Sequence, residues 1–471
     1  MKKDKINRSI LFSTYIFLAV FVGLIGYLVY FNIVKSDSIM NNSYNKRQEI
    51  LAKKVLRGSI LASDGSVLAT TLVDSDGNET RYYPNGSLLS HVIGYIGNGG
   101  SGLESFGAYY MLTSNENMWN QISKDFAGEK SSGDNMVTTL DLGLSQAAYN
   151  ALGSNIGSVI VMEPSTGKIL TMVSTPDFNP NTIETEWENI ISDENSSVLL
   201  NRATQGLYPP GSTFKVVTLL EYLREHPDDY EDYEYNCTSS YKVGNNSISC
   251  SHQTAHGLQN LKLSFANSCN CSFINMGLSL NKKQYQSTAE DLLFNSELPL
   301  DNIEYKKSQF VLTEDSDEWN TAQTAFGQGE TLVTPMHLAL ITCAIANDGK
   351  LMTPYMIDSI ASVDGKTIKT FKNSEYGNLM TKDEATIIQD CMEAVITQSF
   401  GWIFGSSDYT VAAKSGTAQY GTNGYEHSLF MSYSPVENPE IAVIVVLEGG
   451  EQQSGHAGSV AKEIYDYYYS R

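Results

Sequence analysis

The sequence predicts an α+β protein in which one antiparallel sheet takes its strands from both ends of a large domain. Residues 157–174 show two apolar strand patterns around the turn residues 164–167, which is typical of a hairpin. A long helical section follows. The chain returns to strand patterns at 410–419, 428–434 and 441–448, before a last helix near 458–469. Strands at both ends with helices between them indicate one sheet with a helical insert.

The chain begins with a segment long enough to cross a membrane. Residues 10–34 carry no charged side chain, and they follow the basic residues Lys2, Lys3, Lys5 and Arg8. An apolar run of this length is typical of a transmembrane helix, and the basic residues favour a cytoplasmic tail, residues 1–9. A cleaved signal peptide would have a shorter apolar core and a small-residue cleavage site. We therefore expect a single-pass anchor, with everything after Lys35 on the extracytoplasmic side.

Residues 35–153 indicate a small stalk domain that is mainly β. Short strand patterns at 58–62 and 65–72 are separated by turn residues, and residues 136–149 change from a strand pattern to an amphipathic helix. This region has no catalytic spacing of residues. With 471 residues, the chain is long enough for this stalk and one large domain, which we place at residues 154–471.

The charge of the chain excludes nucleic acid as a natural partner. The formal net charge is −22, and the first 35 residues carry +4, which leaves −26 for the remainder. A strongly negative surface repels nucleic acid. The densest acidic stretch, residues 225–234, is best explained as a solvated loop, because its spacing matches no EF-hand calcium loop.

Six cysteines divide into two groups. Cys343 and Cys391 lie in apolar helical patterns and are best explained as small core residues. Cys237 and Cys250 flank a polar loop and could form a disulfide in an oxidising exterior. Alternatively, Cys250 and His252 could hold Zn²⁺ together with His256 and either Cys237 or Cys271, although no common zinc module has this spacing. Free thiols are the third alternative, and the sequence leaves all three open; the remaining cysteine is Cys269.

The most informative local pattern is a serine and a lysine three residues apart at a predicted helix start. Pro209 and Pro210 end any preceding helix, and residues 212–223 show a new helical pattern. Ser212 and Lys215 would then share one face of that helix. A serine at a helix N-terminus lies near unpaired backbone N–H groups, and a lysine with a lowered pKa can take its proton. Taken alone, the motif also fits a plain N-cap serine.

A second polar group, Ser268 and Asn270, lies between two helical patterns. These side chains could pass a proton to a leaving amine and bind a substrate amide. Taken alone, Ser-Cys-Asn is an ordinary turn. None of the seven histidines has a spacing that suggests a Ser-His-Asp triad, and His427 is better explained as a satisfied or surface histidine than as a base.

A third group, Lys414 to Thr417, lies in a strand pattern. Lys414 offers a positive charge for a substrate carboxylate, and Ser415 and Thr417 offer hydroxyl groups for the same anion. Gly416 leaves space for the backbone of a substrate, although a glycine that merely relieves packing is equally common in strands.

The order Ser-x-x-Lys, Ser-x-Asn and Lys-Ser-Gly resembles the three-part signature of penicillin-binding proteins and serine β-lactamases. Nearly the whole chain is similar to the shorter type of class B penicillin-binding protein, a monofunctional peptidoglycan D,D-transpeptidase. The resemblance implies a penicillin-binding transpeptidase (serine β-lactamase-like) fold behind the stalk and anchor. The further motifs that carry it are Arg57-Gly58-Ser-Ile-Leu, Gly102-Leu103-Glu104, Thr139-Leu-Asp, Thr166-Gly-Lys-Ile-Leu, Asp177-Phe-Asn-Pro-Asn, Phe326-Gly-Gln-Gly and Val333-Thr-Pro335.

The resemblance also implies a catalytic role for four residues. Ser212 would be the acylated nucleophile and Lys215 its base. Ser268 and Asn270 would complete the proton relay and the amide contact. The reaction this implies uses no cofactor, and no metal is expected among the catalytic residues.

By the same resemblance, Lys414, Ser415, Gly416 and Thr417 would line the substrate strand, and the backbone N–H groups of Ser212 and Thr417 would form the oxyanion hole. The substrates would be peptidoglycan stem peptides, β-lactam antibiotics would be inhibitors, and the role would lie in cell shape or cell division. The chain shows no glycosyltransferase pattern. The resemblance therefore implies a multi-pass membrane glycosyltransferase as partner, docked through anchor and stalk.

Two other classes share parts of this pattern. A membrane-anchored serine β-lactamase has all three motifs, but it usually needs neither an uncleaved anchor nor a stalk, and it would deacylate quickly. A non-catalytic scaffold of the wall-synthesis machinery would not need the intact polar residues of the three motifs. The sequence therefore favours the transpeptidase.

Overall fold

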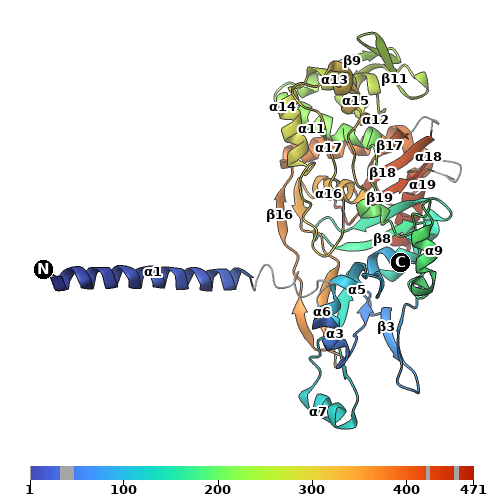
Figure 1. Cartoon of the computed structure of the whole chain (residues 1–471). Helices are drawn as coiled ribbons and strands as arrows, with labels where there is room; N and C mark the ends of the chain where they lie inside the picture. Colours follow the sequence, from blue (N-terminus) through green and yellow to red (C-terminus); the bar gives the residue numbers. More distant parts are fainter. Residues whose placement is uncertain (1, 32–46, 421–424, 450–455) are drawn as a thin grey trace.

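The computed structural model describes residues 2–31, 47–420, 425–449 and 456–471, and Figure 1 shows their arrangement. The centre of the large domain is a five-stranded antiparallel sheet in the order β17-β18-β19-β7-β8. The predicted hairpin, the three C-terminal strands and their pairing into one sheet are confirmed. The strands are β7 (Gly157–Met162), β8 (Ile169–Thr175), β17 (Ala412–Tyr420), β18 (Tyr425–Ser434) and β19 (Ile441–Leu447).

Helices cover both faces of this sheet. The pair α8 (Leu142–Leu152) and α19 (Ala457–Ser470) packs on the sheet, and α16 (Pro335–Ala346) packs against β18, β19 and β7. All seven residues of β19 and all twelve residues of α16 are buried. A strand or helix without a polar face is stable only in an interior, so β19 and α16 form the centre of the core.

The segment between β8 and β17 is mainly helical, as predicted, but it also contains short strands that the sequence analysis does not predict. The strand pairs β9–β12 and β10–β11 lie beside α13, at the top of the view in Figure 1. The helices are α9 (Ile183–Ser192), α10 (Arg202–Gln205), α11 (Lys215–Glu225), α12 (Leu261–Ala266), α13 (Asn270–Ser279), α14 (Lys282–Asp291), α15 (Glu318–Ala325), α17 (Lys382–Val395) and α18 (Gly401–Phe404). The short strands are β9 (Glu234–Cys237), β10 (Ser240–Val243), β11 (Asn246–Ser249), β12 (Gly257–Asn260), β13 (Lys350–Met352) and β16 (Glu375–Asn378).

A second, six-stranded sheet lies below the first, in the order β15-β14-β6-β2-β3-β4. Its strands β14 (Ile357–Ala361) and β15 (Thr367–Thr370) come from far beyond the predicted domain boundary near Ser154, and β14 pairs with β6. Segments from both sides of that boundary therefore fold together, and the boundary itself stays a prediction. The remaining elements are α3 (Arg47–Ala52), β1 (Val55–Leu56), β2 (Ile60–Leu61), β3 (Val67–Val73), β4 (Glu79–Tyr82), α4 (Ser90–Ile93), α5 (Gly102–Phe106), α6 (Ala108–Met111), α7 (Met118–Ala127), β5 (Ser131–Ser132) and β6 (Asn135–Thr138).

A buried ion cluster joins two of the sequence motifs in this region. The carboxylate of Glu104, on α5, accepts hydrogen bonds from Arg57 Nε at 2.8 Å and from Arg81 Nε at 2.7 Å, and its side chain is fully buried. Arg57 also donates to the backbone carbonyl of Glu104. One carboxylate thus ties the turn before β2, the strand β4 and the helix α5 together.

The apolar N-terminal segment forms the helix α1 (Lys2–Tyr30), whose residues Ile10–Tyr30 have a mean hydropathy of 2.1 and are all exposed in the protein alone. A helix of 21 apolar residues matches the thickness of a bilayer core, so this segment fits a single membrane anchor. Residues 32–34 of the predicted anchor lie outside the described residues.

Replacing Glu104 by Gln should destabilise the fold, because two largely buried guanidinium groups lose their shared counter-charge. Breaking a buried pair in this way costs about 3–5 kcal/mol. Thermal unfolding of the full-length protein in detergent should therefore show a clearly lower midpoint. The control Asp390→Asn breaks an exposed pair with Lys262 and should leave the midpoint unchanged. Equal midpoints for the two variants would contradict this account.

Candidate active site

The first predicted pair lies on a tight turn that runs into a helix. After Pro209 and Pro210 the chain forms a 3₁₀ turn, η2 (Gly211–Phe214), and continues directly into α11. The helix predicted for residues 212–223 is thus present, although its first turn is 3₁₀. Ser212 and Lys215 lie on one face, and Lys215 Nζ lies within hydrogen-bond distance of Ser212 Oγ, at 3.1 Å.

The second predicted pair lies where the turn after α12 enters α13, with Ser268 in the turn and Asn270 at the first position of α13. Ser268 has a φ of +51°, a left-handed conformation that turns the chain sharply before the helix. This turn brings the side chains of Ser268 and Asn270 to the amine of Lys215. Lys215 Nζ is 3.1 Å from Ser268 Oγ and 2.7 Å from both Ser268 O and Asn270 Oδ1.

The amine of Lys215 is completely buried, and its contacts are oxygens of uncharged groups. No carboxylate among the described residues pairs with it. Burial without a counter-charge disfavours the ammonium form, which lowers the pKa of Lys215 from its ordinary value near 10.5 to about 7.

The contact geometry suits a neutral amine. A carbonyl oxygen and an amide oxygen, both at 2.7 Å, take the two N–H groups of a neutral amine. The amide orientation is supported by Asn270 Nδ2, which donates to Ser249 O at 3.2 Å. The nitrogen lone pair then faces the hydroxyl groups of Ser212 and Ser268, so either hydroxyl can donate to it.

The third predicted group lies on β17, at the edge of the five-stranded sheet, and its lysine points inward. Lys414 is fully buried, and its Nζ donates to Ser268 Oγ at 3.0 Å and to Ser415 O at 2.9 Å. Burial and the nearby Lys215 lower the pKa of Lys414 well below its ordinary value. Direct contact of Lys414 with a substrate carboxylate stays a prediction, because in the free protein this amine is bound to Ser268.

Glycine is required where β17 meets the turn that carries Ser212. A Cβ on Gly416 would lie 2.9 Å from Pro210 O, and a Cβ on Gly211 would lie 2.6 Å from Thr417 O. The sequence analysis leaves two explanations for Gly416, the approach of a substrate backbone and the relief of packing. In the structure, β17 itself lies so close to the η2 turn that neither Gly416 nor Gly211 has room for a side chain.

These residues open onto one cleft of about 780 Å³. Ser212, Ser268 and Asn270 line it together with Ser415 and Thr417, while the amines of the two lysines lie behind this surface. The structure therefore brings the three predicted groups into one site. The opposite wall comes from residues 247–253 and from the aromatic side chains Trp319 and Phe326.

Comparison with known proteins identifies the family. Residues 157–466 match the family model of the penicillin binding protein transpeptidase domain, which is more than half of the chain. The chain belongs to the penicillin-binding protein transpeptidase family. Residues 57–136 match the penicillin binding protein A dimerisation domain.

Relatives and solved structures of this family cover most of the chain. It is 31% identical over 460 residues to the peptidoglycan D,D-transpeptidase PbpA of Mycolicibacterium smegmatis, covering 91% of each chain. It is 28% identical to the peptidoglycan D,D-transpeptidase MrdA of Acinetobacter baumannii, covering 83% of this chain and 66% of that one. The fold is similar to penicillin-binding protein A of M. tuberculosis, with a TM-score of 0.78, 24% identity and 87% and 98% of the two chains covered. The fold is also similar to the D,D-transpeptidase domain of a peptidoglycan glycosyltransferase from Eggerthella lenta, with a TM-score of 0.77 and 28% identity. This similarity covers 88% of this chain and 98% of that one.

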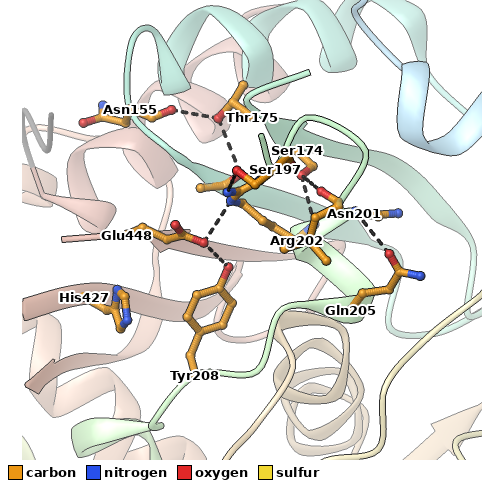
Figure 2. A network of polar contacts seen from close by, with 12 residues as sticks. Asn155, Ser174, Thr175, Ser197, Asn201, Arg202, Gln205, Tyr208, His427 and Glu448 are labelled. Carbon is orange, nitrogen blue, oxygen red and sulfur yellow. Dashed lines mark hydrogen bonds and ion pairs between the residues drawn. The ribbon is translucent and has the colours of Figure 1, made fainter. Parts of the chain in front are cut away.

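A polar network holds the segment that precedes the Ser-x-x-Lys motif of this penicillin-binding protein (Figure 2). Glu448, after β19, accepts hydrogen bonds from Arg202 Nε and from the Tyr208 hydroxyl, both at 2.8 Å. The Arg202 backbone N–H donates to Ser174 Oγ at 3.0 Å. The network joins the sheet to the chain four residues before Ser212. Sequence reasoning missed it, because its members carry no spacing signal and Glu448 lies 240 residues or more from Tyr208 and Arg202.

His427 belongs to the edge of the same network. Its ring packs edge-on against the Tyr208 ring, with centroids 5.2 Å apart, and its Nδ1 accepts a hydrogen bond from Gly449 N at 3.1 Å. It is buried and satisfied, as the sequence analysis predicts, and the contacts of Ser212 do not include it.

Four side chains of the types that bind metal ions gather beside the cleft. Cys237, Cys250, His256 and Cys269 place one ligand atom each within 4.8 Å of one another. Of the three alternatives for Cys237 and Cys250, the disulfide is not formed in the structure, because their Sγ atoms are 3.7 Å apart, whereas an S–S bond is about 2.05 Å long. Among the described residues, His252 is not part of this group and Cys269 is. Cys343 and Cys391 are buried elsewhere in the core, as predicted.

Replacing Gly327 by Ala should slow acylation by penicillin on the order of a hundredfold, because a Cβ there would lie 1.8 Å from Gly211 O and displace the turn that carries Ser212. Gly329→Ala is the matched control. It has nearly the same positive φ in the same loop, but its Cβ would lie 3.5 Å from the nearest atom. Acylation rates from stopped-flow or gel-based labelling compare the two. Equal losses would mean that backbone strain, and not the displaced turn, is responsible.

Proposed function

We propose that the protein is a membrane-anchored peptidoglycan D,D-transpeptidase that cross-links stem peptides through an acyl-enzyme on Ser212 and is inhibited by β-lactams. The observation that carries this proposal is the amine of Lys215, which is buried beside the Ser212 hydroxyl and has a pKa near 7. An amine of this kind is a base of suitable strength at neutral pH. The two relatives named above, both called peptidoglycan D,D-transpeptidases, support the choice of substrate.

In the first half of the reaction, Lys215 takes the proton of the Ser212 hydroxyl. Ser212 Oγ then attacks the carbonyl carbon between the last two D-alanines of a stem peptide. The carbonyl oxygen becomes negative, and we assign the N–H groups of Ser212 and Thr417 to stabilise it. The close approach of β17 to the η2 turn supports this assignment. The C–N bond then breaks, and the leaving D-alanine amine takes the proton from Lys215.

In the second half, the amine of a second stem peptide attacks the ester carbon. Lys215 accepts the proton of this amine, and Ser212 Oγ leaves and regains a proton, so that the enzyme returns to its starting state. The Ser268 hydroxyl is suited to relay these protons, because it lies 3.1 Å from the Lys215 amine and 3.0 Å from the Lys414 amine. Asn270 is assigned to the amide of the bound peptide.

The terminal carboxylate of the donor peptide, or that of a β-lactam, is assigned to the β17 side of the cleft. The hydroxyl groups of Ser415 and Thr417 line the cleft there, and Gly416 keeps the strand close to the turn. Lys414 lies directly behind them and contributes its charge through Ser268 when it is protonated. Two hydroxyl groups backed by an amine are suited to bind a carboxylate.

The rest of the chain would place this site at the outer face of the membrane. We propose that α1 spans the membrane once with residues 1–9 in the cytoplasm, that residues 35–153 act as a stalk and residues 154–471 as the catalytic unit. The basic residues before the apolar run support this orientation. A transpeptidase of this kind needs a partner that polymerises glycan strands. We propose a multi-pass membrane glycosyltransferase that contacts α1 and the stalk.

Intact-protein mass spectrometry after incubation with penicillin tests the proposal. The wild-type protein should gain the mass of one whole penicillin, because opening of the β-lactam ring releases no leaving group, and Ser212→Ala should gain none. Ser415→Ala, which removes a hydroxyl from the same cleft, should still be acylated. An adduct on Ser212→Ala would disprove the nucleophile, and a wild-type adduct that hydrolyses within seconds would indicate a β-lactamase instead.

A further inference from the structure

The thiol cluster beside the cleft is formed by residues from three separate segments. Cys237 ends β9, Cys250 precedes a short 3₁₀ turn after β11, and Cys269 is the N-cap of α13. The three cysteines are between 0% and 3% exposed, and His256 reaches the group from the loop before β12. Three thiols and an imidazole from separate segments are thus brought together at one place.

The distances between these ligand atoms match those around a tetrahedral metal ion. Cys250 Sγ is 3.7 Å from Cys237 Sγ and 3.8 Å from Cys269 Sγ, and Cys237 Sγ is 3.6 Å from His256 Nδ1. Zinc binds sulfur at about 2.3 Å and imidazole nitrogen at about 2.0–2.1 Å, so a tetrahedral site has S–S edges of about 3.8 Å and S–N edges of about 3.5 Å. The observed separations are those of ligands around a shared ion.

We propose that the protein binds one Zn²⁺ ion through Cys237, Cys250 and Cys269 Sγ and His256 Nδ1. Three thiolates and an imidazole are ligands that favour zinc over the oxygen-seeking Ca²⁺ and Mg²⁺. Four protein ligands complete a tetrahedral shell, so the ion is structural and holds no reactive water. Binding converts three thiols to thiolates and releases three protons to solvent, which leaves the site with one net negative charge.

Two neighbouring groups support the sulfur ligands from outside the shell. The backbone N–H of Ser272 points at Cys269 Sγ, with N and S 3.4 Å apart, as expected for a thiolate that accepts a hydrogen bond. Cys271 Sγ is 3.5 Å from Cys250 Sγ, but Cys271 lies outside the group of four mutually close ligands. We assign Cys271 to the outer shell.

The position of Cys269 links this metal site to the catalytic turn. Cys269 lies between Ser268 and Asn270, whose oxygens contact the Lys215 amine. An ion on Cys269 would fix this strained turn against the β9–β12 and β10–β11 pairs, which otherwise form a small outlying region. This role of the ion rests on the proposed function: the ion positions the partners of Lys215. Its loss should slow acylation of Ser212 and loosen the Ser268 turn.

Metal analysis of the full-length protein, purified in detergent without chelators, tests the proposal. Inductively coupled plasma mass spectrometry should find one zinc per chain. Replacement of the zinc by Co²⁺ should give the visible absorption of tetrahedral cobalt together with thiolate charge-transfer bands. A zinc-free protein with reduced cysteines would overturn the proposal. A disulfide among these cysteines would overturn it too, and would show in the intact mass as a loss of two hydrogen atoms.

Variants identify the ligands. Cys237→Ser and Cys250→Ser should each lose the zinc and slow acylation of Ser212. The matched controls Cys343→Ser and Cys391→Ser, which alter buried cysteines far from the cluster, should keep one zinc per chain, and Cys271→Ser should keep it too. Loss of zinc from Cys271→Ser, or its retention in Cys250→Ser, would overturn the ligand set.

Zinc content is measured without substrate. A protein that acylates without zinc would therefore refute the metal site alone, and a zinc-loaded protein that does not acylate would refute only the proposed function.

Discussion

The site depends on one buried amine that has no counter-charge. Lys215 Nζ is enclosed by Ser212 Oγ, Ser268 O, Ser268 Oγ and Asn270 Oδ1, and these groups cannot neutralise an ammonium ion. A carboxylate in this position would hold the proton on the lysine and leave the serine without a base. The other features of the site hold these oxygen atoms in place and bring the amine to the nucleophile.

Three structural units supply what this amine needs, and each is fixed from outside the cleft. The η2 turn is fixed by Gly327, whose carbonyl accepts from Gly211 N at 2.8 Å, and by the Arg202–Glu448–Tyr208 network. The Ser268 turn is fixed by its left-handed backbone conformation and, in our proposal, by an ion on Cys269. The third unit, β17, is an edge strand of a sheet whose neighbouring strands are buried on both faces. Placement to a fraction of an ångström requires such support.

Local patterns predict the sheet and its helical insert, and the residues that meet in the cleft are indicated by the order of the three motifs and by the family resemblance. The strands at both ends of the domain were visible as apolar runs, and Ser212 and Lys215 were visible because i and i+3 share a helix face. Contacts between segments far apart in the sequence could not be predicted in this way. The pairing of β14 with β6 and the buried contact of Glu448 with Arg202 leave no periodic signal in either segment. The inward direction of the Lys414 side chain depends on strand register. The presence of Cys269, and not His252, among the four clustered side chains depends on loop geometry.

The pH dependence of acylation tests the state of Lys215 most directly. The second-order rate constant for acylation by penicillin, measured at constant ionic strength and temperature, reports the free enzyme. Below its pKa, Lys215 carries a proton and cannot accept another, so the rate should rise about tenfold per pH unit and level off above a midpoint near the pKa of about 7. Lys215→Arg should show no acylation across the range, since a guanidinium stays protonated. A rate that is flat from acidic to alkaline pH, or that falls as the pH rises through 7, would contradict the central role of a neutral Lys215.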